Sequence, residues 1–229
     1  MEILAIIPAR KDSKWIINKN IKKINGKPLI SYSIEAALNS KHINKVAVST
    51  DSDEILKIAD NYNVESIKRP SDLAQDDSTT VDAIKHTLDT LKESDNYSPE
   101  VLILLQPTSP LRDSDDIDEA MKMFLEDDDA DSIISIAKFT HDPLWSFKIE
   151  DDYLSPFFDE EFLNKRRQEL PQLYLPNGAI YIIKTEKLLE KNSFILKKSK
   201  AYLMTREKSF DIDTELDFKI VNCLMNDNK

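Results

Sequence analysis

Glycine is nearly missing from this chain of 229 residues, in which only Gly26 and Gly178 occur. The dinucleotide-binding fingerprint requires three closely spaced glycines, and the Walker A phosphate loop requires two glycines ahead of its lysine. Neither motif is present, so the sequence excludes both of these glycine-rich nucleotide sites. Any nucleotide bound by this chain is held by side chains and by the backbone of other residues.

Cysteine, histidine and long apolar runs are also scarce. One cysteine, Cys223, permits no internal disulfide, which favours a reducing cytoplasm. No apolar run approaches the ~20 residues of a bilayer span, and the opening MEILAII is too short for a signal sequence and carries an acid. We therefore expect a cytoplasmic chain with no membrane partner. The three histidines, at positions 42, 86 and 141, lack the spacing of zinc ligands.

Hydrophobic patterning predicts one large α/β domain over residues 1–229. Apolar residues make up 41% of the chain and charged residues 32%, as in a globular protein. We expect helices at 29–38, from the acidic cluster at 51–54 to 61, from 78 or 79 to about 91, from 114 onward, at 185–191 and from 214 onward. We expect strands at 2–7, 45–50, 65–68, 100–105, 132–137, 178–183 and 201–204. Alternating strands and helices predict a mostly parallel sheet. Residues 100–105 are nearly all apolar, which predicts the central strand, whereas 201–204 is expected at an edge.

Two helices have distinct terminal signals. Ser114 is the expected N-cap of one helix, with three acids in its first turn and a buried stripe of Ile117, Ala120, Met121 and Phe124. The last helix begins with Thr214 and Asp217 at capping spacing. Its expected apolar stripe consists of Leu216, Ile220, Val221 and Leu224.

Positive charge gathers in one stretch of an otherwise acidic chain. Residues 10–27 contain seven cations and one acid, a local charge of +6, whereas the whole chain carries −11 and has a pI near 4.8. A chain this acidic is not expected to bind nucleic acid, which requires a basic surface. This basic loop follows the carboxyl end of the buried strand expected at residues 2–7. A basic loop in that place favours binding of a polyanion. The alternative is a solvated basic loop.

A pair of carboxylates near the end of the chain is typical of a metal site. Asp211 and Asp213 are two apart in an extended stretch, so both side chains project to the same side while Ile212 enters the core. Mg²⁺ commonly takes one or two carboxylates and completes its shell with waters and phosphates. The alternative is that these acids only place negative charge ahead of the last helix, a role that Glu215 and Asp217 could fill.

The alternation of strand and helix stops at Phe139. Eight of the 18 aromatic residues lie between positions 139 and 174, with Lys165, Arg166 and Arg167 among them. Aromatic residues and arginine are enriched at protein interfaces. The segment is therefore expected to be an insert that contacts another chain, and the alternative is an insert that packs on its own subunit.

Several motifs carry a resemblance to a known family. IPAR at residues 7–10, followed by Ser13, Lys14, Lys19 and Asn20, resembles the opening motif of the CMP-sialic acid synthetases, the N-acylneuraminate cytidylyltransferases. Further motifs extend the resemblance along nearly the whole chain: STD at 49–51, RP at 69–70, LQPTSPLR at 105–112, PNGAIY at 176–181 and DIDT at 211–214. The resemblance implies a three-layer, Rossmann-like nucleotidyltransferase fold with residues 139–175 as a dimerisation insert. It also implies a homodimer that transfers CMP from CTP to a nine-carbon 2-keto acid sugar and releases pyrophosphate.

The resemblance assigns roles to individual residues. Lys14, Asp211 and Asp213 are the expected catalytic residues, and the two aspartates bind the Mg²⁺ cofactor. The nucleotide is expected to contact a set of cationic and polar residues: Arg10, Lys14, Lys19, Asn20, Arg69, Ser78 and Thr79. The acid sugar is expected to contact Gln106, Arg167, Asn177, Tyr181 and Phe194, with Arg167 supplied by the partner subunit. Alternatively, Tyr181 and Phe194 are core aromatics and Asn177 belongs to an ordinary turn.

Two other functions remain open. A cytidylyltransferase for an eight-carbon sugar acid of the Kdo type would share the fold and the reaction, although QPTSP and DIDT fit the nine-carbon branch better. A regulatory protein that binds a nucleotide without turnover is the second alternative. The family usually has glycine where Asp12 and Trp15 stand and proline where Ile17 stands, and large residues crowd a loop that approaches phosphates.

The sequence also gives a hypothesis about the sugar. Some sialic acid enzymes carry a lysine where Trp145 stands and an arginine where Leu175 stands. A less polar wall favours a sugar with deoxy or methyl groups, because each unmatched buried hydroxyl costs ~1–3 kcal/mol. We therefore expect a legionaminic-type acid to be at least as good a substrate as N-acetylneuraminic acid, unless both positions lie outside the site.

Overall fold

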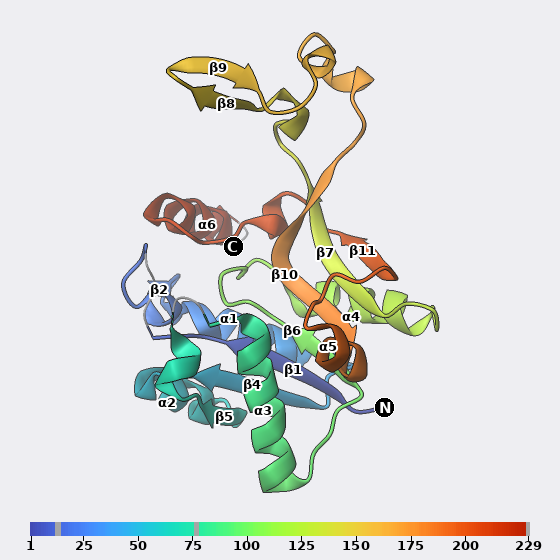
Figure 1. Cartoon of the computed structure of the whole chain (residues 1–229). Helices are drawn as coiled ribbons and strands as arrows, with labels where there is room; N and C mark the ends of the chain where they lie inside the picture. Colours follow the sequence, from blue (N-terminus) through green and yellow to red (C-terminus); the bar gives the residue numbers. More distant parts are fainter. Residues whose placement is uncertain (12–14, 76–77, 228–229) are drawn as a thin grey trace.

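The core of the molecule is a seven-stranded sheet (Figure 1). The structure is a computed structural model that describes residues 1–11, 15–75 and 78–227. The strand order is β11-β7-β10-β6-β1-β4-β5, so the predicted central strand, β6, is in the middle and the predicted edge strand, β11, is at one edge. The strands are β1 Ile3–Pro8, β4 Lys45–Thr50, β5 Glu65–Lys68, β6 Val101–Leu104, β7 Ser132–Lys138, β10 Tyr174–Lys184 and β11 Ser199–Leu203.

The sheet is mostly parallel, as predicted. β1 runs parallel to both β4 and β6, β4 runs parallel to β5, and β7 runs parallel to β11. β10 is antiparallel to both of its neighbours, β6 and β7. The carboxyl ends of the parallel strands therefore share one edge of the sheet, where ligands of open α/β sheets bind.

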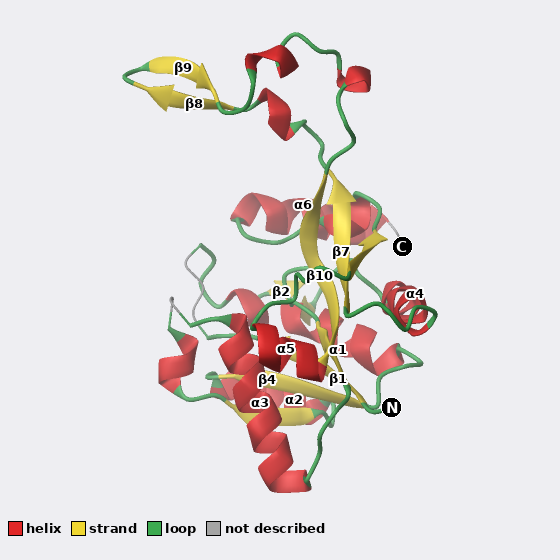
Figure 2. Cartoon of the chain, turned by 45° about the vertical axis from the view of Figure 1, so that its right-hand side comes forward, coloured by secondary structure: helices red, strands yellow, loops and turns green. Residues whose placement is uncertain are grey.

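Helices cover both faces of the sheet and complete three layers (Figure 2). On one face, Ala5 and Ile7 of β1 pack with α1 Leu29–Asn39, α2 Asp53–Asn61 and α4 Ser114–Leu125. On the other face, Leu4 and Ile6 pack with α3 Thr80–Asp95 and α5 Thr185–Lys191. Successive residues of β1 thus feed opposite cores, as the period of a strand requires.

A third small core lies at the carboxyl edge of the sheet, beneath α6 Glu215–Asp227. Ile212 is fully buried there, as predicted, against Ile16 and Phe218. The predicted stripe of α6 is partly wrong, because Leu216 is 64% exposed whereas Phe218 and Val221 are buried. Packing on Ile212 selects the helix face that carries these two residues.

The basic loop contains a short hairpin, and other connections contain single turns of 3₁₀ helix. The hairpin pairs β2 Lys23–Ile24 with β3 Lys27–Pro28 through Asn25 and Gly26, which have φ angles of 49° and 82°. Asn-Gly is the favoured pair for such a turn. The 3₁₀ turns of the body are η1 Lys19–Ile21, η2 Ser71–Ala74 and η6 Glu207–Ser209.

One predicted helix cap is displaced by a residue. Asp113, rather than Ser114, is the N-cap of α4: its carboxylate accepts from the Asp116 amide at 3.1 Å, and the Asp116 carboxylate accepts from the Asp113 amide at 3.0 Å. This reciprocal pair forms a capping box. The predicted buried stripe of α4 is confirmed.

The insert leaves the sheet after β7 and returns along β10. It contains a hairpin, β8 Phe147–Glu150 with β9 Tyr153–Pro156, and the 3₁₀ turns η3 Pro143–Trp145, η4 Glu160–Phe162 and η5 Arg167–Glu169. β10 begins at Tyr174, four residues earlier than predicted, because 174–176 continue the pairing with β7 beyond the core. In both views the hairpin projects away from the body (Figures 1 and 2).

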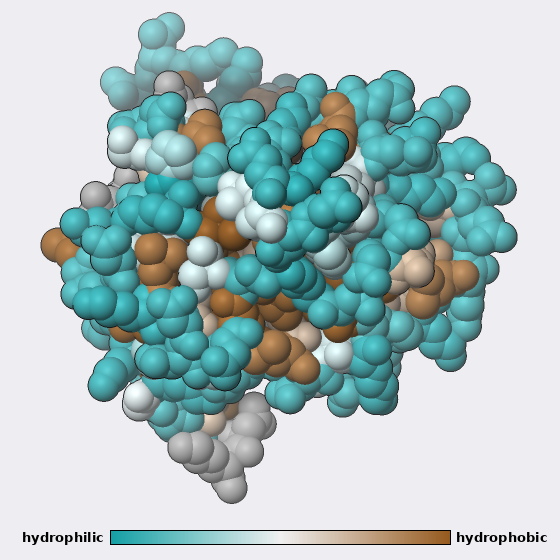
Figure 3. Space-filling model, turned by 90° about the horizontal axis from the view of Figure 1, so that it is seen from below, coloured by the Kyte–Doolittle hydropathy of each residue, from teal (hydrophilic) through white to brown (hydrophobic). Residues whose placement is uncertain are grey.

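The insert exposes apolar side chains. Phe147, Ile149, Tyr153, Leu154 and Phe157 are between 48% and 78% exposed. The hairpin therefore leaves these side chains largely uncovered by its own subunit, whereas Leu170 of the insert is buried. Figure 3 shows the face of the molecule opposite the insert, which is predominantly hydrophilic and carries its apolar side chains in small groups. Over the described ranges, no helix has both the length and the apolar character of a membrane span.

Candidate active site

Two cavities meet at the carboxyl edge of the sheet. The first has a volume of about 320 Å³ and is lined by Pro8, Arg10, Lys19, Asn20, Arg69, Leu73, Ala74, Gln75, Ser78, Thr79, Thr80, Gln106, Pro107 and Thr108. The second has a volume of about 290 Å³ and is lined by Gln106, Ala137, Leu175, Pro176, Asn177, Gly178, Tyr181, Ser209 and Asp211. Gln106, which follows the central strand β6, lines both cavities and so marks their junction.

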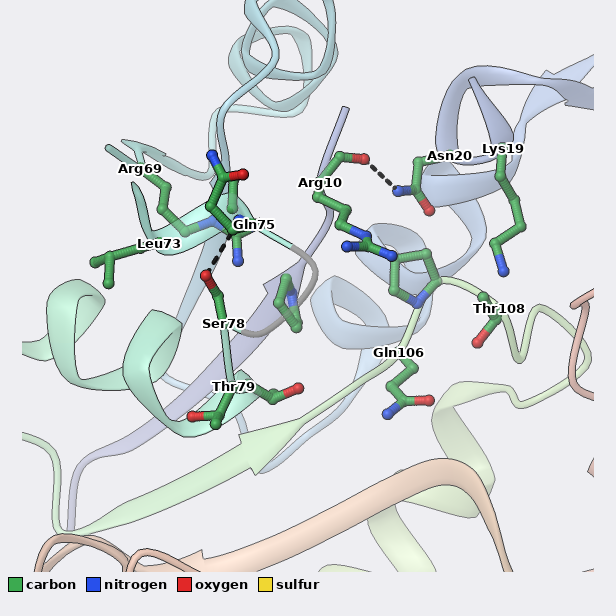
Figure 4. Close-up of a pocket in the computed structure, with 14 residues that line it drawn as sticks. Arg10, Lys19, Asn20, Arg69, Leu73, Gln75, Ser78, Thr79, Gln106 and Thr108 are labelled. Atoms are coloured by element: carbon green, nitrogen blue, oxygen red, sulfur yellow. Dashed lines mark hydrogen bonds between the residues drawn. The ribbon is translucent and has the colours of Figure 1, made fainter. Parts of the chain in front are cut away.

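The first cavity brings together most of the residues predicted to contact a nucleotide. Arg69, Ser78 and Thr79 lie on one side, Lys19 and Asn20 lie on the other, and Arg10 lies between them (Figure 4). These residues come from segments that are far apart in the sequence, and they follow strands β1 and β5, which flank β4 in the sheet. The cavity thus combines three cations with several neutral polar groups.

Two of the polar residues are held in place by local hydrogen bonds. The Asn20 amide donates to the Arg10 carbonyl at 2.9 Å (Figure 4), and the Ser78 hydroxyl donates to the Asp72 carbonyl at 2.9 Å. Thr79 caps α3 through a capping box with Asp82. Helix N-termini attract anions and polar oxygens, so this wall of the cavity can donate hydrogen bonds to a ligand.

Arg69 is buried although it carries a charge. Its guanidinium is 3.5 Å from the Ser49 carbonyl, and burial lowers its pKa, an effect that Asp51 opposes. The Nε of Arg69 and the Ser49 hydroxyl have no hydrogen-bond partner within the described part of the chain. Arg69 lines the first cavity, so its charge can contribute to binding of an anionic ligand there.

Lys19 connects the first cavity to the aspartate pair. Its buried ammonium donates to the Ile212 carbonyl at 2.7 Å and to Asp213 Oδ1 at 3.2 Å. One cation of the basic loop therefore sits beside one of the two carboxylates predicted to bind a metal.

Asp211 is the carboxylate at the mouth of the second cavity. Desolvation by the surrounding protein raises the pKa of the Asp211 carboxyl, and Asp213 raises it further, whereas a hydrogen bond from Thr108 and the charge of Lys19 oppose the shift. Two neighbouring carboxylates, with Lys19 beside Asp213, fit a divalent cation. Among the described residues no group of three acids, histidines or cysteines surrounds a metal position. Water and phosphate oxygens would complete the shell, as they usually do for Mg²⁺.

The second cavity contains most of the residues predicted to contact a sugar. Asn177 is buried: its amide nitrogen donates to the Ser209 hydroxyl at 2.9 Å, and its oxygen accepts from Ser135. Tyr181 lines the cavity and packs on Phe194, with ring centroids 5.4 Å apart. Phe194 itself is half-buried against the core. The Asn177 interpretation as an ordinary turn is wrong, because Asn177 and Gly178 lie within β10.

Arg167 does not reach either cavity of its own chain. It lines a separate cavity of about 460 Å³ at the root of the insert, where its guanidinium is 3.5 Å from the Phe139 carbonyl. Trp145 and Leu175, on which the hypothesis about the sugar rests, lie in different places. Leu175 lines the second cavity, whereas the Trp145 indole donates to the Phe162 carbonyl within the insert at 3.0 Å.

Two of the three residues at which the basic loop departs from the family pattern, Trp15 and Ile17, lie within the described residues. Trp15 and Ile17 are 75% and 85% exposed, and neither lines the first cavity. Trp15 therefore does not crowd the cavity. Lys14, predicted to be catalytic, and Asp12 lie outside the described residues.

Sequence reasoning missed several residues that line the two cavities, among them Thr108 and Ser209. Thr108 lines the first cavity, bonds to the Asp211 carboxylate and accepts from the Ile212 amide at 2.9 Å. It belongs to the QPTSP motif, which could have identified it. Ser209, the partner of Asn177, has no comparable signal in the sequence.

Known proteins resemble this chain over most of its length. A sequence model described as cytidylyltransferase matches residues 4–222. An N-acylneuraminate cytidylyltransferase of Escherichia coli is 38% identical over 96% of this chain but 51% of its own length, so the chain spans about half of that relative. A CMP-N,N'-diacetyllegionaminic acid synthase of Campylobacter jejuni is 37% identical over 98% of this chain and 95% of that protein.

A solved structure shows the same fold. The CMP:2-keto-3-deoxy-manno-octonic acid synthetase complexed with CTP aligns over all of both chains with a TM-score of 0.75, at 16% sequence identity. At this identity the likeness concerns the fold alone. The match to residues 4–222 and the agreement with the C. jejuni protein along nearly its whole length carry the stronger conclusion: this chain belongs to the cytidylyltransferase family.

Proposed function

We propose that this protein transfers CMP from CTP to a nine-carbon 2-keto acid sugar and releases pyrophosphate. The observation that carries the proposal is the junction of two cavities at Gln106, with Lys19, Asp211 and Asp213 beside it. One cavity is rich in cations and the other combines amide, phenol and carboxylate groups with an apolar wall. Relatives named for N-acylneuraminate and for diacetyllegionaminic acid support the substrate class.

The first cavity fits a nucleoside triphosphate. Arg10, Lys19 and, by resemblance, Lys14 would neutralise the phosphates, since cations act as point charges for them. Arg69 and Asn20, with Ser78 and Thr79, would contact the base and ribose. Nucleotidyl transfer relies on positioning and electrostatic stabilisation, so these residues need form no covalent intermediate.

Asp211 and Asp213 would hold Mg²⁺. The donor set fits because, among the residues that the structure describes, the two adjacent carboxylates share Lys19 as a close counter-charge and leave positions for phosphate oxygens. When bound, the ion would neutralise charge that develops at the α-phosphate. Thr108, which bonds to the Asp211 carboxylate, would fix the orientation of that ligand.

The second cavity fits the acid sugar. Gln106 and Asn177 can exchange hydrogen bonds with hydroxyl and acetamido groups, and Tyr181 on Phe194 supplies an aromatic surface. Ala137, Leu175 and Pro176 form an apolar wall. Such a wall favours a sugar with deoxy and methyl groups, so we propose a legionaminic-type diacetamido acid as a substrate at least as good as N-acetylneuraminic acid.

The assembly proposed for this function is a homodimer formed through the insert. Apolar side chains of β8 and β9 are exposed, and Arg167 lies away from the sugar cavity of its own chain. In a dimer, Arg167 would be available to the acid sugar bound by the partner subunit. A reducing cytoplasm fits the single cysteine.

A pyrophosphate-release assay tests the proposal. The protein is incubated with CTP, Mg²⁺ and one of three acids: N-acetylneuraminic acid, a diacetyllegionaminic acid or the eight-carbon Kdo acid. We expect release with the nine-carbon acids. Release with the eight-carbon acid alone would support the Kdo alternative, and CTP binding without release would support a regulatory protein.

The same assay decides between the nine-carbon acids. A kcat/KM for the legionaminic-type acid equal to or above that for N-acetylneuraminic acid is the expected result. A tenfold or larger preference for N-acetylneuraminic acid, about 1.4 kcal/mol in transition-state free energy, would contradict the apolar-wall argument.

A further inference from the structure

Arg112 is a buried charge that neither cavity uses directly. It ends the QPTSPLR segment between β6 and α4, and it is 1% exposed, the largest side chain buried to that degree. Desolvation lowers its pKa to about 10, an effect that Asp116 and Asp113 oppose. Burying a guanidinium is unfavourable unless its hydrogen bonds are made, so its contacts indicate what it is retained for.

The guanidinium contacts are concentrated on one carbonyl. Arg112 Nη2 donates to the Ser33 hydroxyl at 2.7 Å and to the Gln106 carbonyl at 3.3 Å. The Ser33 hydroxyl in turn donates to the same Gln106 carbonyl at 3.2 Å. Two donors from α1 and from the end of the loop thus fix the backbone of the residue that joins the two cavities.

The remaining donors of Arg112 are on two other guanidinium nitrogens. Its Nε and Nη1 have no hydrogen-bond partner within residues 1–11, 15–75 and 78–227. A guanidinium selected to stabilise a core would be expected to bond a carboxylate in the fork geometry that it prefers. Within the described residues Arg112 forms no ion pair: Asp113 and Asp116 are near enough to affect its pKa, but both pair with Lys208.

The backbone that Arg112 fixes leads to both halves of the site. The Gln106 side chain lies against Gly178 of the second cavity, where an added β-carbon would be 2.8 Å from Gln106 Oε1. Two residues later, Thr108 accepts from the Ile212 amide and bonds to the Asp211 carboxylate. A shift of the Gln106 carbonyl would therefore move a residue shared by both cavities and a partner of the aspartate pair.

We propose that Arg112 is a positioning residue for the transfer reaction. It acts through Ser33 and the Gln106 carbonyl to hold Gln106 and Thr108 in register with the aspartate pair, and it touches neither substrate. This inference rests on the proposed function, since it assigns Arg112 a role in the same site. The bland alternative is a core arginine that supports only the fold.

Two substitutions separate these roles. Arg112→Lys keeps the charge, but the lysine side chain is shorter, so its ammonium does not reach the position from which Nη2 contacts both Ser33 and Gln106. Ser33→Ala removes one of the two donors without removing the guanidinium. Thr87→Ala is the matched control, because Thr87 is a fully buried hydroxyl on α3 that donates to the Ala83 carbonyl at 2.8 Å, away from the loop. For each protein we measure the melting temperature, kcat, KM for both substrates and the dissociation constant of CTP.

We expect kcat to fall about 100-fold in Arg112→Lys, the scale for a misplacement of about 1 Å at a reacting centre, and about tenfold in Ser33→Ala. Thr87→Ala should lower the melting temperature and leave kcat within twofold of the wild type. Unchanged kcat and KM in Ser33→Ala and Arg112→Lys, with only a lower melting temperature, would overturn the proposal. If Arg112→Lys fails to fold, Ser33→Ala decides.

The outcome is separable from that of the proposed function. A wild-type protein that binds CTP but releases no pyrophosphate would contradict the proposed reaction alone. In that case the CTP dissociation constants test the positioning role, because Gln106 and Thr108 line the first cavity. Weakening of threefold or more in Ser33→Ala, without weakening in Thr87→Ala, would support it, and equal affinities would overturn it.

Discussion

Lys19 and Asp213 are 194 positions apart in the sequence, and the Lys19 ammonium lies 3.2 Å from Asp213 Oδ1. Lys19 also holds the Ile212 carbonyl at 2.7 Å, so its position is fixed by the segment that carries both aspartates. The basic loop and the aspartate pair therefore form one electrostatic unit. A cation so placed can neutralise phosphates without leaving the carboxylate beside it.

Lys19→Met is expected to lower kcat/KM by ~100-fold or more, the scale for losing one preorganised electrostatic contact. Methionine approximates the length of the buried stem but carries no charge. Lys23→Met is the control, because Lys23 is an exposed cation of the same loop that lines neither cavity. Steady-state kinetics decide the matter, and equal losses in both variants would show that only the total charge of the loop counts.

Asp213→Asn is expected to abolish turnover while the fold persists. The asparagine oxygen can still accept from Lys19, but the site loses a negative charge needed for a divalent cation. Glu215→Gln is the control, because Glu215 is an exposed acid two residues after Asp213 that pairs with Lys22. This variant should retain near-wild-type kcat. Turnover is measured across a Mg²⁺ titration together with the far-UV circular dichroism. Wild-type rates for Asp213→Asn at ordinary Mg²⁺ would refute the metal assignment.

Gly178→Ala is expected to lower both stability and activity. Gly178 has a φ of +78°, and its added β-carbon would meet Gln106 Oε1 at 2.8 Å. Gly26→Ala is the matched control, since Gly26 has a φ of +82° and nothing within 4 Å of such a carbon. The strain of the left-handed backbone, about 1–2 kcal/mol in unfolding free energy, should be similar in both variants. Only Gly178→Ala should lose kcat/KM; a comparable loss in Gly26→Ala would contradict the contact with Gln106.

Asp113→Ala is expected to destabilise the protein by about 1 kcal/mol, the usual cost of losing an N-cap. Ser114→Ala should change the unfolding free energy by much less, because the Asp113 carboxylate and not the Ser114 hydroxyl accepts from the Asp116 amide. Urea unfolding followed by circular dichroism measures both values. A larger effect for Ser114→Ala would restore Ser114 as the cap.

Ile149→Glu combined with Leu154→Glu is expected to convert a dimer into monomers. The two side chains are 75% and 68% exposed and oppose each other in the β8–β9 hairpin. Leu189→Glu, on α5 and 47% exposed, is the control for a charge placed on an apolar surface position elsewhere. Sedimentation at micromolar protein concentration reports the mass. A monomeric and fully active wild-type protein would refute the proposed assembly.

The sequence predicts the sheet because its signals are local. Alternation within β1 sends Leu4 and Ile6 to one core and Ala5 and Ile7 to the other, and any strand of that composition would do the same. The start of β10 was not predictable in this way. Pro176 is a residue that usually argues against a strand interior, and the pairing of 174–176 with β7 depends on where the insert leaves the sheet.

The site residues also divide into those with a local sequence signal and those placed by tertiary packing. Arg10, Asn20 and Arg69 stand directly after strands or in the basic loop, so the common edge of a parallel sheet brings them together. Arg167 belongs to the insert, whose path away from the sheet is not encoded by any local pattern, and it lines a different cavity. For α6, apolar residues occupy more than one face, and only packing on Ile212 distinguishes buried Phe218 from exposed Leu216.

β10 joins three regions of the molecule in one strand of 11 residues: Tyr174 stands at the root of the insert, Asn177 in the second cavity and Ile182 in the core. Only Leu175 and Pro176 separate the first two, and both still pair with β7, so a change in the angle of the insert is passed along a paired strand. A substitution that tilts the insert therefore also displaces Asn177. Association with another subunit and choice of sugar would then be inherited as a single trait, and selection acting on either one would alter the other.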